Sequence, residues 1–204
     1  MSLFVSFEGG EGCGKSTQVR ILHNRLTRAG YAATMVHEPG GTALGERIRT
    51  ILKHKIQVQV SPLSEVILFN VSRSQLVAEV IKPVLDAGGI IISDRFADST
   101  IAYQSYGRGI DLAVVTRLNH IAAQGVQPDI TFLLDIVPEV GLERKRQKAN
   151  DRFEKENLEF HIRVRQGFLE LATRDPVRWQ VIDATLPRAD IGDLIWAQVL
   201  RMIE

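Results

Sequence analysis

Several features that would point to a secreted, membrane-bound or nucleic-acid-binding protein are missing from this sequence of 204 residues. Cysteine occurs once, at Cys13, so no internal disulfide can form, and a lone thiol fits a reducing compartment. Neither sign of charge is in excess, because 25 basic and 24 acidic residues give a net charge of +1. That balance offers no bulk argument for binding nucleic acid or an anionic membrane. The first residues lack the basic region and apolar core of a signal peptide, and no apolar run reaches transmembrane length, so we expect a cytoplasmic protein.

Short apolar runs alternate with amphipathic segments along the whole chain. The runs predict strands at 3–7, 31–38, 89–94, 129–136 and 178–184. The segments predict helices at 16–30, 44–53, 63–88, 112–125, 139–148, 154–175 and 189–203. Ser61–Pro62 and Asp111 are start signals, Gly30 is a stop signal, and Pro83 is expected to kink its helix. This order predicts a single α/β domain over 1–204, with a five-stranded parallel sheet covered by helices on both faces.

The most specific motif is FEGGEGCGKST, at residues 7–17, which matches the pattern G-x-x-x-x-G-K-[ST]. It stands between a predicted strand and a predicted helix, which is the context of a phosphate-binding P-loop. Lys15 would reach the β- and γ-phosphates of a nucleotide, and the Ser16 hydroxyl would ligate Mg²⁺. Cys13 is interpreted as a small filler of the loop. The predicted ATP site comprises Gly9, Gly10, Glu11, Gly12, Cys13, Gly14, Lys15, Ser16 and Thr17.

Glu11 is unexpected in such a loop, because a carboxylate repels phosphate. Either it is solvated, or it accepts a hydrogen bond from a hydroxyl group of a second substrate. Two further polar clusters, HEPGGT and SDRFADS, follow the second and third predicted strands, at the edge of the sheet where ligands bind. There Asp94 would hold Mg²⁺ or cap a turn, and Arg95 would grip a phosphate or form a surface ion pair.

Together these residues resemble one family. FEGGEGCGKST, EPGGT, ISDRF, AYQSYGRG and DRFE occur in the order and spacing of the thymidylate kinases, from Phe7 to about Ala184. The resemblance implies the three-layer P-loop nucleoside monophosphate kinase fold. It also implies phosphorylation of dTMP to dTDP by ATP with Mg²⁺, through direct in-line transfer, and a homodimer, for which the helix from Val66 to Val80 is one candidate surface.

The resemblance also implies roles for single residues. Glu11 would contact the deoxyribose, Phe69 would stack on thymine, Arg73 would lie on the base side and Arg95 would bind the phosphate. The implied dTMP site comprises Glu11, Pro39, Phe69, Arg73, Arg95, Ser99, Tyr103 and Gln104. From the sequence alone, Phe69 is equally a core residue of a long helix.

A basic cluster, ERKRQKANDRFE, lies at residues 143–154. It is interpreted as a lid near 144–154 that brings cations to the phosphates, or alternatively as a solvated helix face. Gly12 follows Glu11 where some relatives carry an arginine, so the chain resembles the bacterial type with catalytic cations in the lid. The predicted catalytic residues are Lys15, Arg47, Arg144, Arg146 and Arg152, and the predicted metal ligands are Ser16 and Asp94.

Two other functions remain open at this point. A kinase for another nucleoside monophosphate or for a deoxynucleoside would use the same P-loop. A nucleotide-dependent switch would also use it, but the N-K-x-D motif of GTPase-type switches is missing, and a switch leaves the basic cluster unexplained. The adenine pocket is poorly marked, with the segment 183–191 as the candidate.

Overall fold

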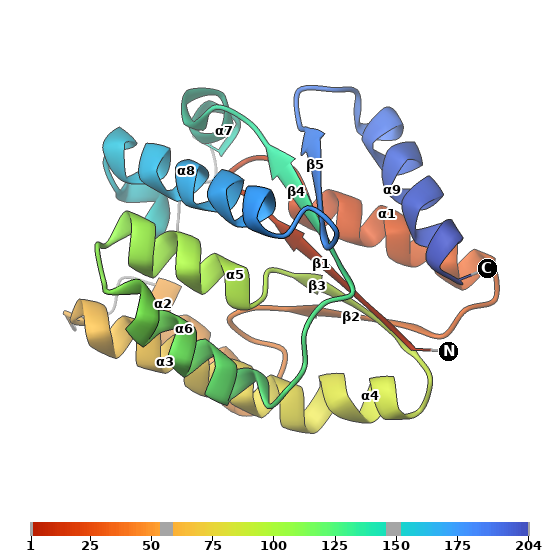
Figure 1. Ribbon diagram of the computed structural model, residues 1–204, viewed down its shortest axis with the longest axis horizontal. Coiled ribbons are helices and arrows are strands. Elements are labelled where there is room, and N and C mark those ends of the chain that lie inside the picture. The colour runs from red at the N-terminus through yellow and green to blue at the C-terminus, as the bar shows by residue number, and fades with distance from the viewer. Residues whose placement is uncertain (1, 54–58, 146–151, 204) are drawn as a thin grey trace.

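The computed structural model describes residues 2–53, 59–145 and 152–203. Over these residues the chain forms a five-stranded parallel sheet with helices on both faces, as predicted (Figure 1). The strand order is β2-β3-β1-β4-β5, which places the first strand at the centre. The strands are β1 (Leu3–Glu8), β2 (Ala33–His37), β3 (Ile90–Asp94), β4 (Ile130–Asp135) and β5 (Trp179–Asp183).

The two faces of the sheet bury separate hydrophobic cores, which gives the fold its three layers. Val5 and Phe7 point to one face, where they pack in a core with residues of α1 (Lys15–Arg28) and α9 (Arg188–Ile203). Phe4 points to the other face and packs in a core with Leu76. Because side chains alternate across a strand and both faces are buried, β3 shows no polar alternation.

The ends of the helices confirm most of the start and stop signals predicted from the sequence. Ser61 and Asp111 accept hydrogen bonds from the backbone N–H groups of Ser64 and Val114, at 3.3 and 3.0 Å, and so cap their helices. Gly30 follows α1 with φ of 89°. Besides α1 and α9, the α-helices are α2 (Ala43–Lys53), α3 (Pro62–Leu76), α4 (Lys82–Asp86), α5 (Ala97–Thr100), α6 (Leu112–Ala123), α7 (Pro138–Lys145) and α8 (Leu158–Arg174) in the described residues.

Two predicted helices differ from the structure in extent. The run 63–88 is divided into α3 and α4 by a π-helical turn, η1 (Val77–Ile81), just before Pro83, which has no N–H to continue the hydrogen-bond ladder. The helix expected from 154 begins at Leu158, because the Asn157 side chain caps it, and Phe153–Lys155 forms a separate 3₁₀ turn, η4. The expected continuation of α7 to 148 lies outside the described residues.

The segment after β3 holds helical structure that the sequence pattern did not predict. It forms α5 and then a π-helix, η2 (Ile101–Gly107). Apolar, hydroxyl and aromatic residues are mixed there, so no 3.6-residue period marks the helix. This unpredicted helix carries three residues of the implied dTMP site: Ser99, Tyr103 and Gln104.

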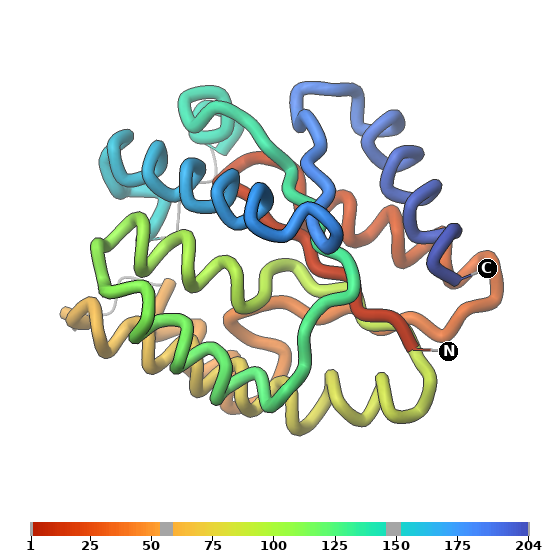
Figure 2. Tube along the Cα trace, viewed as in Figure 1, coloured from red at the N-terminus to blue at the C-terminus, as the bar shows by residue number. Residues whose placement is uncertain are grey.

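The carboxyl ends of β1, β2 and β3 lie level with one another. Phe7 and His37 both pair with Asp94, so the three polar clusters that follow these strands meet at one edge of the sheet. Figure 2 shows both ends of the chain on the opposite side of the molecule. No helix within the described ranges is long and apolar enough to cross a membrane.

Candidate active site

The glycine-rich loop runs from β1 to α1, whose first residue is Lys15. Gly9 and Gly12 have φ of 136° and 69°, which glycine adopts readily and other residues rarely do. The Lys15 ammonium donates to the carbonyl oxygens of Gly9 at 3.0 Å and Gly10 at 2.7 Å, so the cation lies over the loop. Cys13 is buried beneath it and accepts from Lys15 at 3.3 Å, consistent with a filler of the loop.

The loop is pressed backbone to backbone against α7. A Cβ atom added to Gly12 would lie 1.9 Å from the carbonyl oxygen of Gly141, and one added to Gly141 would lie 2.2 Å from that of Glu11. Neither position has room for a side chain unless α7 moves. The position after Glu11 is therefore glycine for a steric reason.

The two predicted metal ligands are adjacent. The Ser16 hydroxyl, on the first turn of α1, donates a hydrogen bond to the carboxylate of Asp94 at the end of β3. Across the described parts of the chain, no group of three or more His, Cys, Asp or Glu side chains could hold a metal ion. One carboxylate and one hydroxyl suit Mg²⁺, which keeps several waters and takes further oxygens from substrate phosphates.

Arg95 and Glu11 form a buried ion pair between the loop and the start of α5. The Arg95 guanidinium donates to Glu11 at 2.9 Å, to Ser99 Oγ at 2.9 Å and to the Tyr103 hydroxyl at 3.0 Å, and it lies 4.9 Å from the Tyr103 ring centre. Burial opposes ionisation of Glu11, but Arg95, Lys15 and nearby cations outweigh it and hold the pKa of Glu11 well below its usual range. Glu11 is therefore not a solvated loop acid. Arg95 has φ of 76°, a backbone conformation that non-glycine residues seldom adopt outside functional sites.

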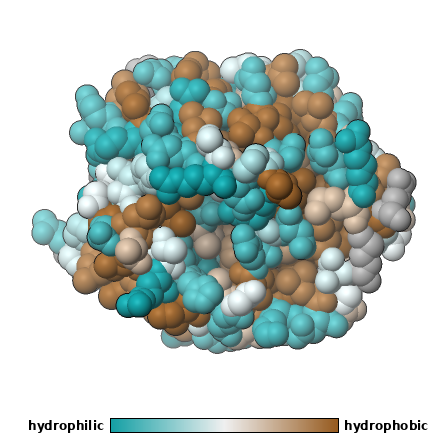
Figure 3. Space-filling view, viewed as in Figure 1, coloured by the Kyte–Doolittle hydropathy of each residue, from teal (hydrophilic) through white to brown (hydrophobic). Residues whose placement is uncertain are grey.

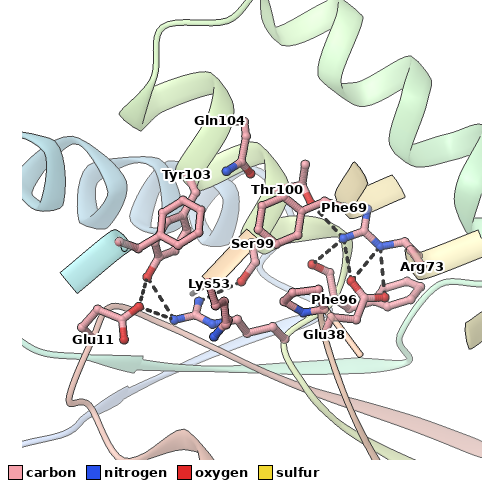
Figure 4. Close-up of a pocket in the computed structure, with 13 residues that line it drawn as sticks. Glu11, Glu38, Lys53, Phe69, Arg73, Phe96, Ser99, Thr100, Tyr103 and Gln104 are labelled. Atoms are coloured by element: carbon pink, nitrogen blue, oxygen red, sulfur yellow. Dashed lines mark hydrogen bonds and ion pairs between the residues drawn. The ribbon is translucent and has the colours of Figure 1, made fainter. Parts of the chain in front are cut away.

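A cavity opens beside this pair (Figure 4). All eight residues of the implied dTMP site line it: Glu11, Pro39, Phe69, Arg73, Arg95, Ser99, Tyr103 and Gln104. Sequence reasoning did not find the other five: Glu38, Lys53, Phe96, Thr100 and Phe153. Phe69 is thus a wall of a cavity rather than only a core residue.

Arg73 lies in the floor of the cavity and is almost fully buried. Its guanidinium donates to both carboxylate oxygens of Glu38, at 2.6 to 3.2 Å, and also to Asn70 Oδ1, Asn119 Oδ1 and Thr100 Oγ1. These acceptors account for all five N–H groups of an arginine. Direct contact between Arg73 and a base would therefore require one of these bonds to be exchanged.

A second, wider cavity joins the first and is lined by the P-loop. The two cavities share Glu11, Glu38, Lys53 and Arg95. The wider one is also lined by Arg49, whose guanidinium donates to the carbonyl oxygen of Pro39 at 2.7 Å.

Arg47, the arginine predicted here, is exposed and lines neither cavity. The role predicted for Arg47 stays a prediction, and Arg49 is the arginine of α2 that lines the P-loop cavity. Gly45, Ile48 and Leu52 form the buried side of α2, so position 49 faces inward and position 47 faces solvent.

The predicted lid cations lie in different places. Arg144 lines the P-loop cavity and donates to the carbonyl oxygen of Ala184 at 3.1 Å. Its neighbour Lys145 also lines that cavity and donates to Glu11 at 3.3 Å and to Glu154 at 2.7 Å. Arg152 is instead paired with Glu65 of α3, away from the P-loop. Arg146 lies outside the described residues.

Glu8, the last residue of β1, is fully buried behind Arg95. Its carboxylate accepts from the backbone N–H of Phe96 at 2.8 Å and from the Ser99 hydroxyl at 2.5 Å. Burial, with the nearby charge of Asp98, raises the pKa of Glu8 to about 7, although Arg95 opposes the shift. The protein therefore keeps a carboxyl group with a pKa of about 7 next to Arg95.

Comparison with known proteins identifies the family of this chain. The model of the family described as thymidylate kinase matches residues 7–195, which is most of the chain. The chain belongs to the thymidylate kinase family.

Individual members of the thymidylate kinase family align along nearly the whole length. The thymidylate kinase of Dehalococcoides mccartyi (strain CBDB1) is 49% identical over 199 residues, which cover 98% of this chain and 96% of that one. The thymidylate kinase of Deinococcus radiodurans is 45% identical over 198 residues, which cover 97% and 96%. The crystal structure of thymidylate kinase from Ehrlichia chaffeensis matches with a TM-score of 0.77 and 34% identity, over 100% of this chain and 99% of that one.

Some residues of this thymidylate kinase site stand in motifs of the sequence but were given no role there. Glu38 stands beside the predicted Pro39, but only the fold shows that it faces Arg73. Phe153 lies within the basic cluster, and its ring centre lies 5.9 Å from that of Phe69. Lys145 could have been singled out, since it belongs to the same cluster as Arg144.

Proposed function

We propose that this chain transfers the γ-phosphoryl group of ATP to the phosphate of dTMP, giving dTDP, by direct in-line displacement. The observation that carries the proposal is the junction of the two cavities. A P-loop lines one, aromatic rings such as Phe69 and Tyr103 line the other, and Arg95 and Glu11 line both. Membership of the thymidylate kinase family supports dTMP as the acceptor.

The acceptor nucleotide would bind with its phosphate at Arg95, whose guanidinium can grip two phosphate oxygens. Its deoxyribose would lie against Glu11 and Tyr103, whose oxygens are 2.8 Å apart. The base would stack on Phe69, and Gln104 would form a hydrogen bond to its edge. A thymine ring can donate N3–H, so the Gln104 carbonyl oxygen is the matching acceptor.

The donor phosphates would bind to the N–H groups at the start of α1, where the helix dipole favours anions. Lys15 would turn from the loop carbonyls to the phosphates. Ser16 and Asp94 would hold Mg²⁺, which supplies positive charge to the phosphate oxygens when bound. Arg49, Arg144 and Lys145 line the same cavity and would neutralise the charge that develops during transfer.

No strong general base is needed, because the acceptor phosphate is already ionised near neutral pH. Catalysis then rests on positioning and electrostatic stabilisation. The cavity supports this, since its cations are held in place by ion pairs such as those of Arg95 and Lys145 with Glu11.

We also propose that the protein is a homodimer through α3 and α6. Leu63, Ile67 and Val71 are 51%, 44% and 40% exposed, and their spacing of four residues places them in one stripe on α3. Val114 and Ile121, exposed on the adjacent α6, extend the apolar surface. Figure 3 shows hydrophobic side chains gathered over this part of the molecule. Within the helix from Val66 to Val80, which the sequence suggested as the dimer surface, Val66 and Val77 are buried. The exposed stripe on α3 is therefore the surface available to a partner.

The test is steady-state phosphoryl transfer from ATP–Mg²⁺ to dTMP, dUMP, dCMP, AMP, GMP and thymidine. We expect the highest kcat/KM with dTMP. A preference for another acceptor would still support a P-loop kinase but would show that dTMP is not its substrate. ATP binding without transfer to any acceptor would favour a nucleotide switch.

A further inference from the structure

A buried acid on α3, Glu65, holds together three polar side chains beside the base end of the cavity. Its carboxylate accepts from Gln104 Nε2 at 2.9 Å, from Arg108 Nε at 3.2 Å and from Arg152 Nη2. The Glu65 side chain is 2% exposed. Glu65 does not line either cavity, so it would act on a bound nucleotide only through its neighbours.

The contact with Glu65 sets the orientation of the Gln104 amide. An ionised carboxylate can only accept hydrogen bonds, so Gln104 must present its NH₂ group to Glu65. The carbonyl oxygen is then the end of the amide left for the cavity that Gln104 lines. Figure 4 shows the Gln104 amide on the same side of the cavity as the rings of Tyr103 and Phe69.

The two arginines keep this carboxylate in place. Arg108 also pairs with Glu156 at 2.7 Å, and its guanidinium lies 5.6 Å from the ring centre of Phe153. Arg152 lies 5.2 Å from the same ring and donates its backbone N–H to the carbonyl oxygen of Lys53 at 3.2 Å. A carboxylate held between two cations stays an acceptor, so the Gln104 amide cannot reverse without losing its partner.

We propose that Glu65 is a specificity-determining positioning residue, which selects thymine over cytosine by keeping the Gln104 carbonyl oxygen directed at the base. The inference rests on the proposed function. Thymine carries a hydrogen on N3 and can donate to that oxygen, whereas N3 of cytosine is itself an acceptor and faces it unpaired. A site that leaves buried polar groups unpaired with the wrong substrate discriminates strongly against it.

The experiment compares kcat/KM for dTMP and dCMP in the wild type, Glu65→Gln and Glu65→Asp. In Glu65→Gln the new amide can donate to Gln104, which lets the Gln104 amide turn and offer NH₂ to N3 of cytosine. In Glu65→Asp the carboxylate retreats by about 1.5 Å, so it remains an anion for the arginines but no longer holds Gln104. We expect the dTMP:dCMP ratio to fall about 10-fold or more in both variants, through KM rather than kcat, with the KM for ATP unchanged.

The exposed acid Glu79, further along the same helical run, provides the control, because Glu79→Gln should leave the ratio unchanged. A ratio within about twofold of the wild type in both Glu65 variants would overturn the proposal. If only Glu65→Gln lowers the ratio, the carboxylate acts through its charge and the arginines, and the proposed action through Gln104 is wrong. If Glu65→Gln does not fold, Glu65→Asp decides alone. Failure of the wild type to phosphorylate dTMP would instead reject the proposed function.

Discussion

Glu8 shows how a single buried group links this site to pH. The unfolded chain releases the Glu8 proton near pH 4.5, whereas the folded protein holds it until about pH 7. The stability that this proton contributes is complete below pH 4.5 and is lost as the pH rises through 7. At pH 8 the ionised, buried carboxylate costs the folded state about 3 kcal/mol.

We therefore expect Glu8→Gln to lose less stability than the wild type between pH 5 and 8. Glutamine keeps an oxygen for the Phe96 N–H group and carries no charge to bury. Urea denaturation at several pH values measures the difference directly. Parallel stability curves for the two proteins over this range would contradict the assignment.

The two central cations should affect different steps. Arg95→Ala removes the proposed grip on the dTMP phosphate, so its dissociation constant for dTMP should rise roughly 10- to 100-fold while ATP binding is kept. Lys15→Ala removes stabilisation of the transferred group, so kcat should fall about 100-fold or more while dTMP still binds. Calorimetry and steady-state kinetics separate the two. Normal dTMP binding by Arg95→Ala would show that the phosphate binds elsewhere.

At this scale, the resemblance to the family supplied the residues that line the cavity, but not the bonds between them. All eight residues that the resemblance implied around dTMP line the pocket, whereas spacing alone marked only the clusters at the strand ends, such as the one with Arg95. No spacing rule reveals that Arg73 pairs with Glu38, which lies 35 positions away in sequence. Such partners depend on tertiary packing.

Among the elements, the contact between the P-loop and α7 has the clearest consequence. Gly141→Ala would place a methyl group 2.2 Å from the Glu11 carbonyl oxygen, so α7 would have to move away from the loop. Arg144 and Lys145, in the last turn of α7, would move with it. We expect kcat to fall about 10-fold or more, with the fold retained.

Val140→Ala is the matched control, since Val140 is the exposed neighbour on the same helix. It should leave kcat close to that of the wild type. Equal activity of Gly141→Ala and Val140→Ala would show that the position of α7 does not matter for transfer.

Long periodic helices and short apolar strands were predictable because their patterns are strong. Ser61 and Asp111 capped their helices as expected. The helix carrying Tyr103 was not predictable, because its inward side faces the cavity as well as the core, and polar residues interrupt the apolar period. A helix that lines a site carries polar residues on its inward side, so its apolar period is weaker than that of a helix that only packs on the core.

For the whole molecule, the apolar stripe on α3 predicts an assembly of two chains. Ile67→Asp should convert a dimer to a monomer, because a charge at the centre of the stripe would be buried without a partner. Leu194→Asp, on α9 across the sheet, is 49% exposed in the wild type and should leave the dimer intact. Sedimentation equilibrium measures both. A wild type that sediments as a monomer at tens of micromolar would contradict the proposed surface.

The strand order also bears on how the chain reaches this structure during synthesis. β1 is made first, yet its neighbours in the sheet are β3 and β4, so Leu3 pairs with Ile90 and Val5 with Ile130. The central strand therefore cannot pair on one side until β3, which ends at Asp94, has been made, and cannot pair on both sides until β4, which ends at Asp135, has been made. Such distant pairings fold slowly and leave an apolar edge open in the meantime. The strand that leads into the P-loop is thus made before both of its neighbours in the sheet and is fixed in place only after them.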